Sequence, residues 1–224
     1  MPQRIAFLRS FVEDTARDPA IARKAVAIIR ESRVPLRDHR SEWSALLKWV
    51  QTNYRFTAEP NERIQSPQYT LTNLHGDCDD GAILLAALGH SIRLPFRFVL
   101  SGRSSQGERA RWVEGVGAPP RGVSWSHIYV MAQWPPFRPT KAAWAEPTLD
   151  VPLGWDSLKE PLPRGRADMG EGEGVSRVRT ILQKLQWQTV GASALGTVLG
   201  GVASYLLVQK VLRPLVEKRG DRRR

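Results

Sequence analysis

Apolar residues recur at helical spacing in two stretches near the beginning of the chain. Within 20–32, isoleucine and alanine residues return every three or four positions, and within 41–54 tryptophan, leucine and valine residues do the same. This spacing places the apolar side chains on one face of a helix. We predict two amphipathic helices, with Pro35 as the break between them and Ser41 as the N-cap of the second.

A continuous apolar run at 82–88 follows Cys78, and we expect a helix that begins at this cysteine and ends near Ile92. Because this run places apolar side chains on all sides of the helix, we predict that it is the central buried helix. The preceding segment, 57–73, has two prolines among polar residues and predicts an irregular connection.

After Pro95 the period of the apolar pattern changes from that of a helix to that of a strand. Strands are predicted near 96–101, 125–133 and 142–148. The segment 102–122 is rich in glycine, serine and arginine, and it predicts a long mobile loop. Helices followed by antiparallel strands indicate an α+β fold and not an alternating, doubly wound one.

The composition bounds the chemistry of the site. With 224 residues, the chain is long enough for one sizeable domain and an appendage. A single cysteine excludes an intramolecular disulfide framework and a zinc site of several cysteines. The four histidines show no metal-ligand spacing, so we expect no metal and no cofactor; they are His39, His75, His90 and His127.

The net charge of +11 is unevenly distributed along the chain. The tail 210–224 has seven basic and two acidic residues, which is nearly half of the excess. The remainder has no zinc finger, RNA-recognition signature or basic stripe with interleaved aromatic residues. We therefore expect no specific nucleic-acid partner, while non-specific attraction to phosphate or anionic lipid stays open.

An uncharged segment at 185–209 is 25 residues long, enough for a helix to cross a bilayer. Small residues recur there every fourth position and include Gly196 and Gly200, a pattern typical of helix self-association in membranes. We predict a spanning helix, with 160–184 as a flexible linker. A buried or self-associating soluble helix is the alternative. The basic tail favours a cytoplasmic C-terminus, whereas the lack of a signal peptide favours a cytoplasmic enzyme domain, so orientation stays open.

Cys78 is the first candidate for catalysis. Backbone N–H groups at a helix N-terminus and the helix dipole favour a thiolate over a thiol. A free cysteine is often a small buried hydrophobe, but the neighbours here are Asp77, Asp79 and Asp80. This polar setting favours a nucleophile.

His127 is the expected partner of the cysteine. It lies within the predicted strand, where strand periodicity places it on one face with Trp125 and Tyr129. A cysteine–histidine pair needs a third group that orients the imidazole. The next predicted strand offers Glu146 and Asp150 for this role.

Three segments together resemble the motifs of the transglutaminase-like superfamily. The Gly-Asp-Cys-Asp-Asp sequence at 76–80, with the helix after it, is similar to the cysteine motif of that family. The segment 125–130 resembles its histidine strand and 144–148 its aspartate strand. The resemblance covers about 36–156 and is closest to bacterial and bacteriophage-encoded members.

The resemblance implies a papain-like α+β fold in which Cys78 attacks a carbonyl, His127 moves the proton and an acid orients the histidine. Glu146 stands where the family usually has aspartate, and Asp150 is the alternative acid. The backbone N–H of Cys78 is an oxyanion donor by geometry, and Gln65 is a second candidate.

These predictions divide the chain into an N-terminal helical segment at 1–35, a catalytic domain at 36–159, and the linker, helix and tail described above. The expected activity is that of a cysteine peptidase, amide hydrolase or acyltransferase that forms a thioacyl intermediate with a protein or peptide substrate. The C-terminal helix would tether the enzyme to a membrane; otherwise it would be cytoplasmic or virion-associated. The alternative is a catalytically inactive structural or binding module of a viral particle or membrane assembly.

Overall fold

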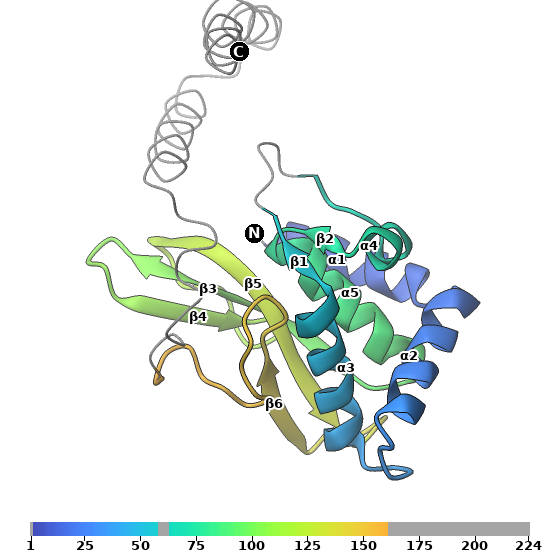
Figure 1. Cartoon of the computed structure of the whole chain (residues 1–224). Coiled ribbons are helices and arrows are strands. Elements are labelled where there is room, and N and C mark those ends of the chain that lie inside the picture. The colour runs from blue at the N-terminus through green and yellow to red at the C-terminus, as the bar shows by residue number, and fades with distance from the viewer. Residues whose placement is uncertain (1, 58–62, 161–224) are drawn as a thin grey trace, which may run out of the picture. The chain divides into compact units, whose positions relative to one another are not determined.

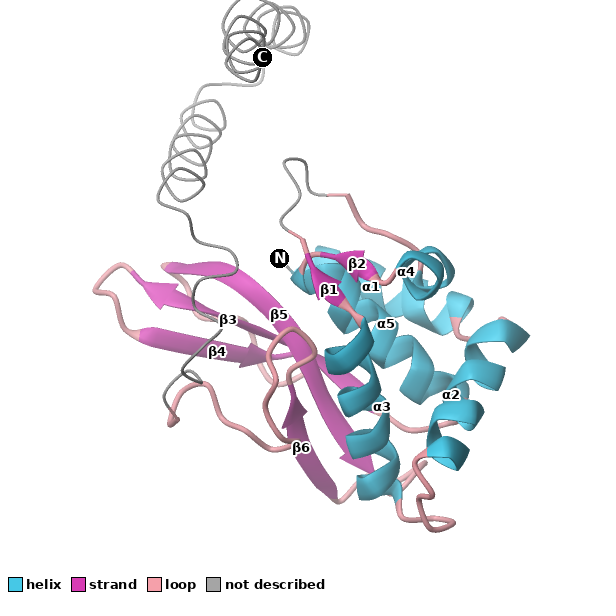
Figure 2. Ribbon diagram, in the orientation of Figure 1, coloured by secondary structure: helices cyan, strands magenta, loops and turns pink. Residues whose placement is uncertain are grey.

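The computed structural model describes residues 2–57 and 63–160. Within these residues, a group of helices lies on one side of a curled antiparallel sheet (Figures 1 and 2). The predicted α+β class is confirmed for this part of the chain. The helices are α1 (Pro2–Thr15), α2 (Pro19–Glu31), α3 (His39–Asn53), α4 (Pro67–Asn73) and α5 (Cys78–Ser91).

Helix α5 is the centre of the helical layer, as predicted. All ten residues from 80 to 89 are buried, and α5 contacts each of the other four helices as well as β3 and β5. Such a helix must be apolar on all sides, which explains the run of alanine and leucine after Cys78. The nucleophile candidate therefore lies at the end of the most enclosed helix described.

Four antiparallel strands make the main sheet, in the order β4-β3-β5-β6. A second, two-stranded parallel sheet joins β1 to β2 beside the start of α5. Its short strands connect the end of α3 to the segment that precedes the cysteine. The strands are β1 (Arg55–Phe56), β2 (His75–Gly76), β3 (Phe96–Ser104), β4 (Arg109–Val113), β5 (Val123–Trp134) and β6 (Lys141–Ala145).

Three local predictions were wrong, each for a reason of local chemistry. The N-cap of α3 is Asp38, whose carboxylate accepts the backbone N–H of Ser41, so the chain turns into the helix three residues early. Helix α4 begins inside the predicted irregular connection because Ser66 caps it and Pro67 takes the first helical position. Strand β4 lies inside the predicted loop, where Trp112 alternates with arginines and is buried.

Helix α1 precedes the first helix predicted from the apolar pattern. Its side chains at Ile5, Leu8 and Val12 are buried in the same core as α5. The spacing of three and four residues gives α1 one apolar face. The helical segment before residue 35 thus shares its core with the elements that follow, although the predicted domain boundaries themselves stay a prediction.

No helix among the described residues combines the length and the apolar character that a bilayer crossing requires. The predicted span at 185–209, with Gly196 and Gly200, lies outside the described residues, as do 161–184 of the linker and the basic tail at 210–224. The membrane tether and self-association therefore stay predictions.

Candidate active site

A reciprocal cap fixes the start of α5 and the backbone of the cysteine. The Asp77 carboxylate accepts the backbone N–H groups of Asp79 at 2.9 Å and of Asp80 at 3.5 Å, and the Asp80 carboxylate accepts the N–H of Asp77 at 3.3 Å. Tyr54 at the end of α3 adds a hydrogen bond to the Asp77 carbonyl at 2.6 Å. Cys78 is consequently the first residue of the helix, with a partly buried side chain.

The Asp80 carboxylate also reaches the loop before α4. It accepts the backbone N–H of Gln65 at 2.8 Å, and the Asp80 side chain is fully buried. The side-chain carbonyl of Gln65 accepts a hydrogen bond from Thr70 at 3.4 Å. This network holds Gln65 beside the first turn of α5, but its role as an oxyanion donor stays a prediction.

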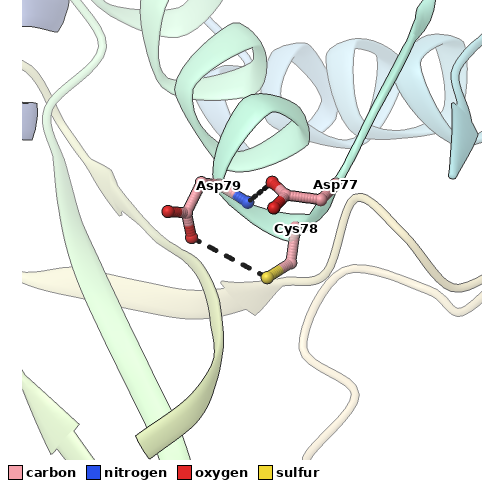
Figure 3. A group of neighbouring side chains, drawn as sticks. All are labelled: Asp77, Cys78 and Asp79. Carbon is pink, nitrogen blue, oxygen red and sulfur yellow. Dashed lines mark hydrogen bonds between the residues drawn. The ribbon is translucent and has the colours of Figure 1, made fainter. Parts of the chain in front are cut away.

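Asp79 is the charged group next to the thiol. Its Oδ1 lies 3.8 Å from the Cys78 Sγ, a weak S–H···O contact, and its Oδ2 lies 2.5 Å from the Arg4 guanidinium on α1. Figure 3 shows the thiol and the Asp79 carboxylate on the same side of the helix start. No pattern in the sequence indicates Arg4, because it lies 75 positions from Asp79.

The side chains in Figure 3 also have the composition of a metal site. Asp77, Cys78 and Asp79 each offer one ligand atom, and these atoms lie within 4.8 Å of one another. However, Asp77 already accepts two backbone N–H groups and Asp79 pairs with Arg4. The Asp77 carboxylate therefore caps the helix, and the Asp79 carboxylate forms an ion pair.

A β-bulge determines which way His127 points. Ser101 of β3 pairs with His127, but the next residue, Gly102, pairs with Trp125, so one residue of β5 is unpaired. Neighbouring positions on β3 face opposite sides of the sheet, and their partners therefore do too. The prediction that Trp125 shares a face with His127 was wrong. Tyr129 does share it, since its ring stacks on the imidazole at 5.8 Å.

Gly102 is what allows this bulge to form. A Cβ atom at this position would lie 2.1 Å from the carbonyl oxygen of Ser124 and 2.9 Å from the Cα of Trp125. Only glycine permits the two backbones to approach so closely. The orientation of the histidine thus depends on a glycine of the neighbouring strand.

Glu146 is the acid that reaches the histidine. Its Oε2 lies 2.6 Å from Nε2 of His127, and its Oε1 accepts both the hydroxyl of Thr148 at 2.7 Å and the Thr148 N–H at 3.0 Å. The Glu146 side chain is only 4% exposed, compared with 30% for His127. Every carboxylate oxygen therefore has a donor, which a buried charge requires.

Gln51 of α3 holds the backbone at this acid and five residues after it. Its buried side-chain amide donates to the carbonyl of Glu146 at 3.0 Å and to that of Val151 at 2.8 Å. Sequence reasoning assigned no role to Gln51 or Thr148. Thr148 could have been predicted, because it belongs to the Glu-Pro-Thr motif that contains the acid. No neighbouring residue in the sequence indicates a role for Gln51.

Asp150 lies elsewhere. Its carboxylate is 2.8 Å from the ammonium group of Lys48, and both side chains are more than half exposed. The structure thus brings Glu146 to His127 and places Asp150 in a surface ion pair.

Burial and charge act in opposite directions on the buried pair. Burial alone lowers the pKa of His127, but the charge of Glu146, with hydrogen bonds from the imidazole to Cys78 and Glu146, raises that pKa well above its usual value. Burial alone raises the pKa of Glu146, yet the charge and hydrogen bond of His127 and the two bonds from Thr148 lower it. Both shifts favour an imidazolium beside a carboxylate.

The thiol of Cys78 is close to the imidazole. Cys78 contributes to the high pKa of His127 through a hydrogen bond and through charge, so the two groups are neighbours. Nε2 of the ring faces Glu146, and this contact leaves Nδ1 unused. A thiol, an imidazole and a carboxylate next to one another are the groups that activation of a cysteine nucleophile uses.

Comparison with known proteins gives one family. A model of the transglutaminase-like superfamily matches residues 23–146. This range includes Cys78, His127 and Glu146 but not α1. No curated protein matches the chain.

Two solved structures are similar to this chain. One is a provisionally named cysteine protease from Cytophaga hutchinsonii, with 17% identity and a TM-score of 0.34, matched over 48% of this chain and 31% of its own. The other is a provisionally named protease from Parabacteroides distasonis, with 9% identity and a TM-score of 0.38, matched over 55% of this chain and 23% of its own. This chain spans less than a third of either protein.

Proposed function

The chain belongs to the transglutaminase-like superfamily, and on this basis we propose that it is a cysteine hydrolase or acyltransferase acting on an amide bond of a protein or peptide. One observation carries the proposal. The Cys78 thiol is a neighbour of the His127 imidazole, and Nε2 of that ring is 2.6 Å from the buried carboxylate of Glu146. We assign Cys78 as nucleophile, His127 as general base and acid, and Glu146 as the orienting acid.

In the first half of the reaction, the Cys78 proton passes to Nδ1 of His127 and Sγ forms a bond to the substrate carbonyl carbon. The carbonyl π pair moves to oxygen and gives a tetrahedral oxyanion. When this intermediate collapses, the C–N bond breaks and the amine leaves with the proton from His127. A thioester at Cys78 remains.

In the second half, water or an amine attacks the thioester. His127 accepts the proton of the attacking group, the C–S bond breaks, and the proton returns to the departing sulfur. Water yields an acid, and an amine yields a new amide. Both acceptors belong to the proposal.

The oxyanion needs hydrogen-bond donors. Helix geometry leaves the N–H groups of the first turn without partners inside the helix, and Cys78 is the first residue of α5. Its N–H is therefore suited to the developing negative oxygen, and the helix dipole adds a favourable field. Gln65 is the second candidate donor.

The Glu146 carboxylate fits its proposed role because it is ionised, buried and fixed. Its lowered pKa keeps the charge that stabilises the imidazolium formed in the first step. Thr148 fixes the oxygen that does not face the histidine. The side chain is one methylene longer than aspartate, yet it reaches Nε2 at hydrogen-bond distance.

The experiment that tests this function uses the full chain and the rate of alkylation by iodoacetamide. Because Cys78 is the only cysteine, the added mass reports on this thiol alone. A free thiol is almost entirely protonated at pH 6.5. We expect rapid alkylation of the wild type at this pH and a loss of at least about tenfold in His127→Ala. His75→Ala, an exposed histidine near the cysteine, is the matched control and retains the rate.

An activated ester then tests the acyl step. We expect p-nitrophenyl acetate to release one equivalent of nitrophenol in a burst and to leave an acetyl group on Cys78, detectable by mass, with neither event in Cys78→Ala. Partition of this acyl-enzyme between water and added hydroxylamine measures the preference for hydrolysis or transfer. A slow thiol that ignores His127 and forms no acyl-enzyme would support the non-catalytic module instead.

A further inference from the structure

Helix α1 lies outside the region matched by the superfamily model but is firmly attached to it. Besides its apolar face, Arg9 holds the helix to the end of β4. The Arg9 guanidinium lies 2.5 Å and 2.8 Å from the two carboxylate oxygens of Glu114 and donates to the carbonyl of Phe96 at 2.8 Å. Its planar group also stacks over the ring of Phe96, 4.3 Å from the centroid. These contacts give α1 a fixed position beside α5.

From this position, Arg4 reaches the first turn of α5. The Arg4 guanidinium lies 2.5 Å from Oδ2 of Asp79, whose other oxygen lies 3.8 Å from the Cys78 sulfur. The Asp79 side chain is 15% exposed, so water screens its charge only in part. A carboxylate so close to sulfur opposes the thiolate in two ways: it repels the negative charge and it accepts the S–H hydrogen bond.

We propose that Arg4 is a positioning residue of the active site, which neutralises Asp79 and holds its carboxylate so that the neighbouring Cys78 can act as a thiolate. This inference rests on the proposed function. The guanidinium binds one oxygen of Asp79, and its positive charge reduces the repulsion between that carboxylate and sulfur. Arg4 touches Asp79 and is assigned no direct contact with substrate.

Other polar and charged groups lie near the same thiol, and they define the background against which Arg4 acts. The carboxylates of the helix start are negative, the histidine–glutamate pair lies on the sheet side, and Tyr54 donates a hydrogen bond to the cap. Arg4 supplies positive charge from the helical side. The groups are Asp77, Asp79 and Asp80 at the start of α5, His127 and Glu146 from the sheet side, Tyr54 at the end of α3, and Arg4 on α1.

The test compares iodoacetamide alkylation in full-length variants, because this reagent is neutral and needs no known substrate. We expect Arg4→Gln to react about three- to fivefold more slowly than wild type at pH 6.5, the effect of one partly exposed ion pair. At pH 10, where thiols are ionised in every variant, the rates should converge. Arg4→Lys retains the charge and should restore most of the rate.

The matched control is Arg17→Gln, which removes the same charge just beyond the other end of α1. Arg17 is 81% exposed and lies 3.9 Å from Asp14. We expect this variant to react like the wild type. An equal slowing in both arginine variants would overturn the proposal, because it would mean that net charge alone changes the rate.

A double variant separates the electrostatic role from a structural one. If Arg4 acts through Asp79, then Asp79→Asn should abolish the effect of Arg4→Gln, and the double variant should match Asp79→Asn within twofold. Slowing that persists in the double variant would overturn the proposal. The proposed function fails separately: in that case the wild-type thiol itself is slow and His127→Ala changes nothing.

Discussion

The helix half and the sheet half of the site are held by different kinds of contact. On the helix side, Asp77 and Asp80 cap the backbone around Cys78 through hydrogen bonds that span no more than three residues. On the sheet side, Glu146 meets a histidine 19 positions away, and a glutamine 95 positions away holds its carbonyl. The cap around Cys78 is a local structure to which long-range contacts from Tyr54 and Arg4 are added, whereas the contacts of Glu146 exist only when the sheet has formed.

Because of this difference, substitutions in the two halves should affect stability and reactivity to different extents. Asp77, Cys78 and Asp79 at the start of α5 are partly open to water, so a hydrogen bond lost by Asp77 can be replaced by solvent. Glu146 is buried, and a donor that loses it has few alternatives. Substitutions on the sheet side should therefore damage fold and activity together, whereas those on the helix side should act more on the thiol.

The largest effect is expected from Glu146→Ala. Removing the carboxylate leaves His127 and both donors of Thr148 without their partner, and loss of one member of a buried pair costs roughly 3 kcal/mol. Urea unfolding followed by tryptophan fluorescence measures this loss. The alkylation rate of Cys78 at pH 6.5 should fall as well, as is expected for His127→Ala.

Asp150→Ala is the control for that prediction. Its ion pair with Lys48 is largely exposed, so the free energy of unfolding should change by less than about 0.5 kcal/mol, with no change in alkylation. Equal losses in the two variants would contradict the proposed division of roles between the acids. Glu146→Asp tests whether the length of the acidic side chain matters, because the shorter side chain retains the charge but must approach His127 by about one methylene length.

A second, smaller loss is expected from Gly102→Ala, which acts on the orientation of His127. The added methyl group would lie 2.1 Å from the Ser124 carbonyl, so the two strands must separate at the bulge. Overpacking of this kind costs about 2 kcal/mol. We also expect slower alkylation of Cys78, because His127 is next to the same bulge, where it pairs with Ser101.

Gly107→Ala distinguishes crowding from simple loss of glycine. Gly107 has a positive φ of 83° but no atom within 4 Å of its added Cβ. It should lose about 1 kcal/mol through backbone strain, with an unchanged alkylation rate. If both glycine variants slowed the thiol equally, the link between the bulge and the histidine would be wrong.

The same local and long-range division explains what the sequence could predict. The Cys78 helix was accessible because its apolar run and its acidic cap are contiguous. The motif in the sequence favoured Glu146 over Asp150, but whether either acid reaches His127 depends on the register of β6 and on Thr148. Trp125 was placed on the wrong face because strand periodicity contains no information on a bulge that a neighbouring glycine permits.

Arg4 marks the limit of sequence reasoning most sharply. It lies on a helix outside the superfamily match, 75 positions from the carboxylate that it binds. Only the packing of α1 on α5 brings the two groups together. Motifs thus identify residues that react, while residues that set the charge around them depend on tertiary structure.

The pH dependence of stability offers a third way to test the sheet half. The lowered pKa of Glu146 adds stability that is present above the ordinary glutamate value of about 4.3 and is lost as pH falls through the folded value. The raised pKa of His127 adds stability that is present below the ordinary value of about 6.5 and is lost as pH rises through the folded value. The pair is therefore most stabilising between the two ordinary pKa values, about 4.3 and about 6.5.

His127→Gln removes the basic side of this dependence. Urea unfolding at pH 5.5 and pH 8.5 should show that the wild type loses stability at the higher pH and that the variant loses less. A His39→Gln variant, which changes a partly buried pair with Glu42 away from the site, controls for histidine loss in general. Parallel losses in the wild type and in His127→Gln would mean that His127 does not bind its extra proton in the folded state.

The smallest expected effect belongs to the helix half. Asp77→Ala removes the N-cap acceptor of α5 and should cost about 1 kcal/mol, while Asp77→Asn retains an acceptor and should cost less than half of that. Both variants remove one negative charge near the thiol, so any change in alkylation that they share reports on charge, and any difference between them reports on the cap. A loss of stability in Asp77→Ala as large as that in Glu146→Ala would contradict the difference between the two halves. It would mean that the first turn of α5 cannot open to water without unfolding the rest of the helix.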